Sequence, residues 1–121
     1  MPIVDIAIVV RAGEVVQKDA AHALANFIAG PLNASPGKVW VRLQLLPEEL
    51  YAENGEEGEN PSPVFVNVLH ADLKPQDQLE REASALAQAI GTCLARSADH
   101  VHIEYAPAGR GRIAFGGRLL R

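Results

Sequence analysis

Apolar residues along the chain gather in four short runs, and the stretches between them repeat apolar positions at helical spacing. Two of the runs, residues 2–10 and 63–69, open with proline and are rich in β-branched side chains. The other two, residues 39–43 and 101–105, come after the helical stretches. Nearly continuous apolarity with β-branched enrichment predicts strands that are buried on both faces or nearly so. The order strand, helix, strand therefore occurs twice.

This doubled order is an internal repeat. It predicts a single domain over residues 1–121, in which residues 2–46 and residues 63–117 are the two copies. Residues 47–62 connect them and carry six glutamates and no basic residue, which is typical of a solvated acidic connection. After Ala106 the balance reverses, with four arginines and no acid.

The two helical stretches have different signals at their ends. In the second, Asp72 is a candidate N-cap and Pro75 suits the first turn. In the first, Gly30 followed by Pro31 predicts the end of the helix, because proline cannot continue the backbone hydrogen bonds. The apolar stripes are Ala20, Leu24, Phe27 and Ile28 in the first helix and Leu79, Ala83, Leu86, Ile90 and Leu94 in the second.

The connections constrain the fold. Parallel strands joined by a helix require right-handed crossovers, so each half is a βαβ unit. Two such units predict an α+β fold, with a four-stranded sheet, two helices on one face and a glycine-punctuated C-terminal hairpin. The helix-free face would carry apolar side chains, either Val4, Ile6 and Ile8 or their odd-numbered neighbours, depending on register. An exposed apolar face of this kind predicts partner subunits.

Composition and charge exclude several classes of protein. With 121 residues, 48% of them hydrophobic, the chain has the makeup of one globular domain. A formal net charge of −4 argues against a nucleic-acid-binding protein. The single Cys93 excludes an intramolecular disulfide and a multi-cysteine metal site, and we expect no metal. No membrane span and no signal peptide are visible, so we expect a soluble cytoplasmic protein.

Pro2, directly after Met1, is the residue with the clearest chemical potential. Removal of Met1 would leave Pro2 with a free secondary amine. Among the proline nitrogens of a protein, only one at the N-terminus can take a proton. An α-amino group has a pKa of roughly 7.7–8.0. An apolar pocket and nearby arginines would both lower that pKa, because each disfavours the cation. A base near neutrality suits proton abstraction beside a carbonyl group.

Three segments resemble the tautomerase superfamily. The tail, residues 109–117 (GRGRIAFGG), is similar to the closing segment of 4-oxalocrotonate tautomerase. Residues 97–105 resemble the last strand of macrophage migration inhibitory factor and its relatives, and residues 46–51 resemble the segment after the second strand in that group. The resemblance covers nearly the whole chain and fits members in which two short units are fused. It implies a homotrimer that isomerises a small 2-oxo or 2-hydroxydienoate acid without a cofactor.

The resemblance also implies site residues. Pro2 matches the catalytic proline of the family. His102 and Glu104 fall where the inhibitory-factor group has tyrosine and asparagine at a pocket mouth shared with a neighbouring subunit, so the specificity would differ. Ile113 and Phe115 match apolar wall positions. The family histidine that lies near the proline corresponds to His70.

Arginines that would bind a substrate carboxylate match less completely. Arg11 lies one residue away from the first carboxylate-binding arginine of the short tautomerases. The second would align with Trp40, and Arg42 is the nearest substitute on that strand. Arg112, between the two wall positions, is a further candidate. The histidines are also compatible with partly buried structural roles, and Glu104 with an ion pair across a subunit contact.

Other functions stay open. One is 5-carboxymethyl-2-hydroxymuconate isomerase. A second is a hydrolytic dehalogenase or malonate semialdehyde decarboxylase, although these relatives have two arginines where residues 70–74 have none. The third is a non-catalytic interaction protein on the same fold, which the departures at His102 and Glu104 favour.

Overall fold

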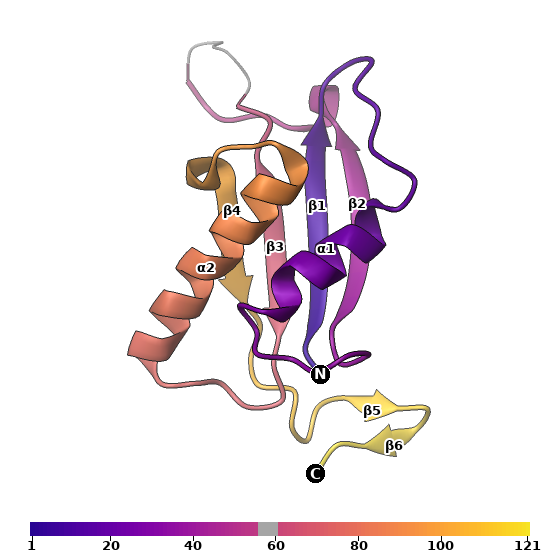
Figure 1. The fold of residues 1–121 in the computed structure, drawn as a ribbon, viewed down its shortest axis with the longest axis vertical. Coiled ribbons are helices and arrows are strands. Elements are labelled where there is room, and N and C mark those ends of the chain that lie inside the picture. The colour runs from indigo at the N-terminus through magenta and orange to yellow at the C-terminus, as the bar shows by residue number, and fades with distance from the viewer. Residues whose placement is uncertain (56–60) are drawn as a thin grey trace.

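The sheet has four strands in the order β2-β1-β3-β4 in this computed structural model, which describes residues 1–55 and 61–121 (Figure 1). Within each half the two strands are parallel, and β1 and β3 meet antiparallel at the centre. The α+β fold expected from the doubled βαβ pattern is confirmed. The strands are β1 (Ile3–Val10), β2 (Trp40–Pro47), β3 (Val64–Leu69) and β4 (Val101–Tyr105).

Both helices, α1 (Ala20–Ala29) and α2 (Gln76–Leu94), cover the same face of the sheet (Figure 1). The chain also forms two short 3₁₀ turns, η1 (Glu48–Leu50) and η2 (Ala98–His100). A C-terminal hairpin of β5 (Ala114–Phe115) and β6 (Arg118–Leu119) lies beyond the sheet. Figure 1 shows this hairpin at the same end of the molecule as the N-terminus.

The core lies between the sheet and the two helices. Val4, Ile6 and Ile8 point toward the helices and are fully or almost fully buried, so the prediction that this set could line the helix-free face is wrong. Cys93 packs against the same core. The buried core also includes Leu24 and Ile28 from α1, Val64, Val66 and Val68 from β3, and Leu86 and Ile90 from α2.

The ends of the helices depart in part from expectation. The first helix stops at Ala29, as Gly30 and Pro31 predict, but Phe27 of its expected stripe is 45% exposed. The second helix begins at Gln76 with Pro75 in the N-cap position. Asp72 is not its cap, because that carboxylate pairs with Arg110 of the C-terminal segment.

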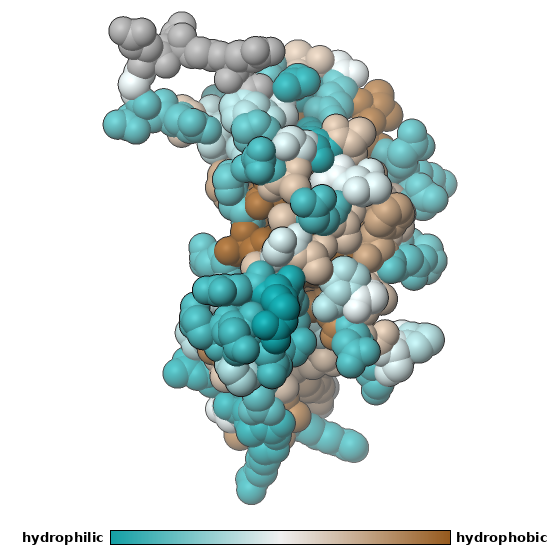
Figure 2. All heavy atoms as spheres, turned by 60° about the vertical axis from the view of Figure 1, so that its left-hand side comes forward, coloured by the Kyte–Doolittle hydropathy of each residue, from teal (hydrophilic) through white to brown (hydrophobic). Residues whose placement is uncertain are grey.

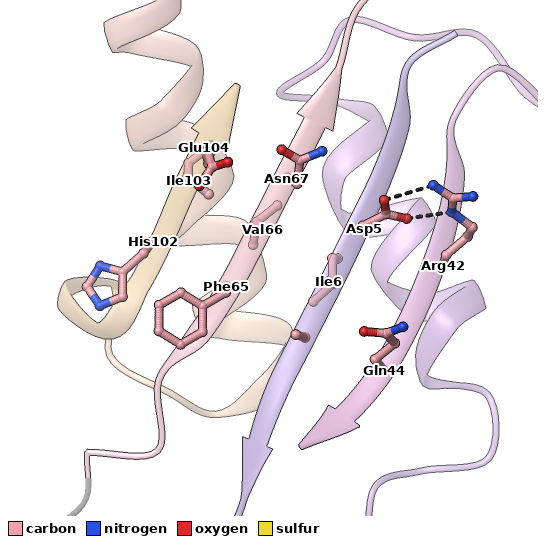
Figure 3. A pocket seen from close by; sticks show the side chains of 11 residues that line it. Asp5, Ile6, Arg42, Gln44, Phe65, Val66, Asn67, His102, Ile103 and Glu104 are labelled. Atoms are coloured by element: carbon pink, nitrogen blue, oxygen red, sulfur yellow. Dashed lines mark hydrogen bonds and ion pairs between the residues drawn. The ribbon is translucent and has the colours of Figure 1, made fainter. Parts of the chain in front are cut away.

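The helix-free face is mixed rather than apolar, because the odd-numbered positions of β1 include a charged residue. The register places Arg42, Asp5, Asn67 and Glu104 side by side in one row across all four strands. A second row consists of Gln44, Ala7, Phe65 and His102. Figure 3 shows both rows on this face. The strand β2 is longer than expected, since residues up to Pro47 pair with β1.

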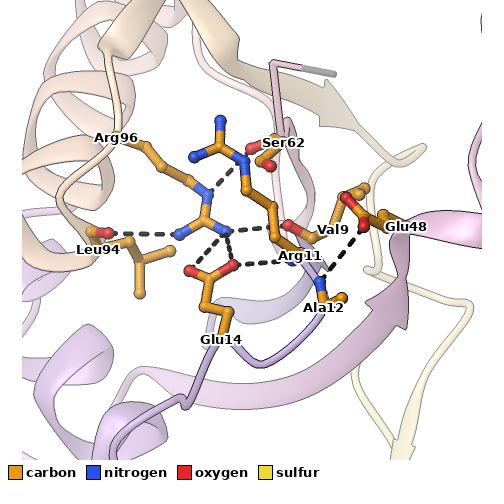
Figure 4. Close-up of polar contacts among 8 residues, drawn as sticks. All are labelled: Val9, Arg11, Ala12, Glu14, Glu48, Ser62, Leu94 and Arg96. Atoms are coloured by element: carbon orange, nitrogen blue, oxygen red, sulfur yellow. Dashed lines mark hydrogen bonds and ion pairs between the residues drawn. The ribbon is translucent and has the colours of Figure 1, made fainter. Parts of the chain in front are cut away.

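At the end of the sheet away from the N-terminus, Arg96 ties several segments together (Figure 4). Its guanidinium donates to the carbonyl oxygens of Ser62 and Val9, each at 2.9 Å, and pairs with Glu14 at 3.0 Å. Burial alone would raise the pKa of the Glu14 carboxyl, but the Arg11 amide and Arg96 lower it. Since the side chain of Arg96 is only 11% exposed, these contacts fix the far ends of β1 and α2.

Part of the acidic connection, including Glu56, Glu57 and Glu59, lies outside the described residues. Ahead of it, the hydroxyl of Tyr51 donates to the carboxylate of Glu53 at 2.5 Å. The division into residues 2–46 and 63–117 stays a prediction. No helix in the described part of the chain is long and apolar enough to cross a membrane. Seen from the α2 side, hydrophilic side chains cover much of the surface, with apolar patches between them (Figure 2).

Candidate functional site

Pro2 lies buried at one end of the sheet, one residue before the central strand β1. Its carbonyl oxygen accepts a hydrogen bond from the Trp40 amide at 3.1 Å. In the antiparallel pair of β1 and β3, Ile3 faces Leu69, so the next step outward sets Pro2 against His70. Met1 precedes Pro2 here, and the Pro2 nitrogen is therefore an amide that cannot take a proton. Removal of Met1 would turn this nitrogen into a secondary amine that can take a proton.

The C-terminal segment is anchored beside this position. The Gly109 amide donates to the His70 carbonyl oxygen at 2.8 Å, and the Arg110 amide donates to the Ala71 carbonyl oxygen at 3.0 Å. A Cβ at Gly109 would lie 3.3 Å from the His70 carbonyl oxygen, a tight contact with the backbone that glycine avoids. The Arg110 guanidinium also forks onto both carboxylate oxygens of Asp72 at 2.8 and 2.6 Å, which lowers the pKa of that carboxyl.

The expected wall residues follow on this segment. Phe115 packs edge-to-face on Trp40, with ring centroids 5.4 Å apart and an interplanar angle of 86°. Since the Trp40 amide is bound to Pro2, this aromatic pair stands at the Pro2 end of the sheet. Ile113 is half-buried, and its amide is held by the Gly109 carbonyl at 3.0 Å. Arg112, between them, is exposed.

Beneath His70 lies a buried carboxylate, which sequence reasoning did not find. Glu82 of α2 accepts hydrogen bonds from His70 Nε2 at 2.8 Å, from Lys74 Nζ at 2.6 Å and from the Tyr105 hydroxyl at 2.8 Å. The His70 ring also stacks on the Tyr105 ring, with centroids 5.9 Å apart. We call His70, Lys74, Glu82 and Tyr105 the Glu82 cluster.

The Glu82 cluster keeps its carboxyl group ionised. Burial alone would raise the pKa of Glu82, but the hydrogen bonds from Lys74, His70 and Tyr105 together lower it below its ordinary value. Burial and the bond to Glu82 raise the pKa of Tyr105, whose hydroxyl therefore stays protonated as a donor.

Three expected residues lie elsewhere, on the helix-free face (Figure 3). Arg42 forks onto the two carboxylate oxygens of Asp5 at 2.5 and 2.8 Å. His102 lies beside Phe65, with ring centroids 5.6 Å apart, and Glu104 stands next to Asn67. The two rows of this face border a hollow of about 720 Å³.

Arg11 follows β1 at the end of the sheet opposite to Pro2 (Figure 4). Its amide donates to the Glu14 carboxylate at 3.0 Å, and it borders a hollow of about 610 Å³ together with Arg96 and His100. Within one chain the expected residues therefore fall into three places. Pro2, His70, Arg112, Ile113 and Phe115 belong to the N-terminal end, Arg42, His102 and Glu104 to the helix-free face, and Arg11 to the far end.

Metal-ligand geometry is lacking in residues 1–55 and 61–121, where no three His, Cys, Asp or Glu side chains gather to hold an ion. Cys93 is a half-buried thiol, and burial raises its pKa.

Comparison with known proteins shows what this fold is. No protein-family model matches the chain, and no curated protein matches it. Solved structures do match. A fused 4-OT, described as a wild-type symmetric trimer, is 18% identical with a TM-score of 0.76, and the match covers 98% of this chain and 94% of that one.

Two further structures extend the comparison. A malonate semialdehyde decarboxylase inhibited by 3-bromopropiolate is 15% identical with a TM-score of 0.69, over 94% of this chain and 88% of that one. The macrophage migration inhibitory factor from Trichinella spiralis is 12% identical with a TM-score of 0.71, over 97% and 98% of the two chains. All three are tautomerase superfamily structures.

Proposed function

We propose that this chain, which has the tautomerase fold, is a cofactor-independent keto–enol tautomerase of small 2-oxo or 2-hydroxydienoate acids. The Pro2 amine, freed by removal of Met1, is its general base. The observation that carries the proposal is the position of Pro2, buried at the start of the central strand β1 beside Trp40 and His70. The tautomerase resemblance of the tail and of β4 adds the reaction type.

The reaction moves one proton between two atoms of the substrate. The neutral amine takes the proton from the enol hydroxyl, or from the carbon beside the carbonyl group, and becomes a prolinium cation. The same cation then returns the proton to the other atom, so no oxidant or cofactor is consumed. The half-exposed Trp40 and Phe115 stand at this end, where they offer an apolar surface that a bound substrate would cover. A desolvated amine stays unprotonated at neutral pH, because burial disfavours the cation.

A substrate carboxylate needs a cation, and a guanidinium gives the strongest charge-assisted pair. Arg112 is the candidate on the same segment as the wall residues, and it is exposed. Arg11 and Arg42 lie away from the Pro2 of their own chain, and Arg42 is already engaged by Asp5. If either arginine binds the substrate carboxylate, it does so in a site that contains the Pro2 of a neighbouring chain.

A homotrimer would supply such neighbours, and the fused 4-OT that this chain resembles is described as a trimer. The edges of the sheet carry opposite charges in the same row, Arg42 on β2 and Glu104 on β4. A cyclic assembly joins unlike surfaces and closes when the rotation fits. We propose that the β2 edge of one chain meets the β4 edge of the next, which would bring His102 and Glu104 toward a neighbour's site.

The experiment is covalent labelling of the amine. Intact mass first establishes that untagged protein has lost Met1. We then expect 3-bromopropiolate, which inhibits the similar decarboxylase, to add to Pro2 and abolish turnover of phenylenolpyruvate or 2-hydroxymuconate. Protein that retains Met1 is the control and should resist labelling. Labelling elsewhere, or full turnover with a blocked N-terminus, would contradict the proposal.

A decarboxylase or hydrolytic dehalogenase is a second candidate, because one of the matching structures is a malonate semialdehyde decarboxylase. Loss of CO₂ from malonate semialdehyde and halide release from 3-chloroacrylate are the assays. A 5-carboxymethyl-2-hydroxymuconate isomerase would be identified by 5-carboxymethyl-2-hydroxymuconate as its preferred substrate. A non-catalytic interaction protein would turn over none of these compounds and would show an N-terminal amine with an ordinary pKa.

A further inference from the structure

Glu82 is the most deeply buried ionised carboxylate of the described residues that the proposed reaction does not use, with a side chain only 3% exposed. Its Oε2 accepts from His70 and Tyr105, and its Oε1 accepts from Lys74. The donors come from the residue after β3, from the loop that follows it and from the end of β4. Such a complete set of partners is what a charge in the interior requires.

The register of β1 and β3, continued by one residue beyond the strands, places the Glu82 cluster next to Pro2. The Val9 amide donates to the Pro63 carbonyl oxygen, so odd-numbered residues of β1 occupy the hydrogen-bonded positions of the antiparallel pair. Continued outward, the register puts Pro2 and His70 at a non-hydrogen-bonded position, where opposite side chains approach most closely. Pro2 has the same parity as Val4, whose side chain faces the helices. The continued register therefore places the His70 side chain beside Pro2, while His70 Nε2 is bound to the Glu82 carboxylate at 2.8 Å.

The charges of Glu82 and Lys74 cancel. Glu82 contributes one negative charge and Lys74 one positive charge, while Tyr105 is a neutral donor. Outside it, the exposed pair of Arg110 and Asp72 is also neutral as a unit. We infer that Lys74 and Glu82 are positioning residues for Pro2: they hold His70 against the Pro2 ring in a charge-compensated cluster, so that the base does not have an unpaired carboxylate near it.

This inference rests on the proposed role of Pro2 as a base and predicts two shifts of opposite sign. Lys74→Met leaves a bare carboxylate, which favours the ammonium form and raises the pKa of the Pro2 amine. Glu82→Gln leaves the lysine cation and lowers that pKa. A unit charge about 10 Å away at an effective dielectric constant of about 20 shifts a pKa by roughly one unit. The shift for Lys74→Met should be smaller, since that side chain is 35% exposed and partly screened.

The double variant Lys74→Met/Glu82→Gln removes both charges and should return the amine pKa close to that of the wild type. The matched control is Lys18→Met, because Lys18 is an exposed lysine in the segment between β1 and α1 and takes no part in the Glu82 cluster. The four variants and the wild type are full-length chains with Met1 removed, checked by intact mass and by circular dichroism.

The readout is an NMR titration of the Pro2 ¹⁵N shift, which needs no turnover. A rise, a fall and a near-return in the three variants, with no change in the control, is the expected pattern. Single variants that both match the control would overturn the inference even if the protein is an active tautomerase. The expected pattern in a protein without turnover would instead uphold the coupling of the Glu82 cluster to the Pro2 amine and refute the proposed function. If Glu82→Gln does not fold, Lys74→Met alone decides, because its side chain is partly exposed.

Discussion

Replacing Glu82 by glutamine should destabilise the fold markedly at neutral pH. Glutamine keeps the shape of the side chain, but its amide nitrogen must face either Lys74 or the donors from His70 and Tyr105, so at least one donor loses its acceptor. Breaking a buried charge pair on one side costs about 3–5 kcal/mol. Because Lys74 is 35% exposed and can turn to water, we expect the lower end, ~3 kcal/mol. For a domain of this size that corresponds to a fall in Tm of about 10 °C.

The loss of stability caused by Glu82→Gln should become smaller as the pH falls. The pKa of Glu82 is lowered from its ordinary value of 4.5 by its partners, so its stabilisation is present above 4.5 and is lost as the pH falls through the lower folded value. The assay is urea unfolding of wild type and Glu82→Gln at fixed protein concentration from pH 7 to pH 3. Glu80→Gln, an exposed site on the same helix, is the control. Equal stability at pH 7, or a difference that does not shrink below pH 4.5, would refute this account of Glu82.

Three further predictions follow from other contacts. Phe115→Ala removes the edge-to-face contact with Trp40, worth about 0.5–1.5 kcal/mol, and should raise KM in steady-state kinetics while far-UV circular dichroism stays unchanged. Glu104→Arg should lower the mass seen by sedimentation from three chains toward one, whereas Glu80→Arg on the helix side should not; an intact trimer would exclude the edge contact proposed with Arg42. Arg96→Met should cost about 3 kcal/mol in urea unfolding, because it removes a buried donor from two backbone carbonyl groups and from Glu14, which keeps only the Arg11 amide among its hydrogen bonds described above; a loss below ~0.5 kcal/mol would show that Arg96 does not hold this end together.

The arrangement of strands and helices could be predicted because the repeated order of apolar runs leaves few ways to connect them. The face of the sheet that each β1 residue occupies could not be predicted, since both the odd-numbered and the even-numbered residues of that strand are apolar apart from Asp5. Asp5 was the available signal: a carboxylate belongs on the side away from the helices, where Arg42 pairs with it. The row from Arg42 to Glu104 depends on the register of four strands, which no single run encodes.

The candidate site divides in the same way. Pro2 and the tail carry local patterns, so sequence resemblance selects them. The Glu82 cluster is formed by residues from four separate places in the chain, and each of them has an ordinary surface or helical role when read alone. Asp72 is a case in which the local pattern misleads. Its spacing suits an N-cap of α2, but its carboxylate pairs with Arg110 instead.

The most direct test of the central claim is the pH–rate profile of the Pro2 amine. Ketonisation of phenylenolpyruvate is measured from pH 5 to pH 9 with two forms of the untagged protein, one lacking Met1 and one retaining it, each verified by intact mass. The account predicts that kcat/KM of the processed form rises with pH through an amine pKa below the ordinary 7.7–8.0. It predicts no turnover at any pH for the form in which the Pro2 nitrogen is an amide. Equal rates for the two forms would show that Pro2 is not the base.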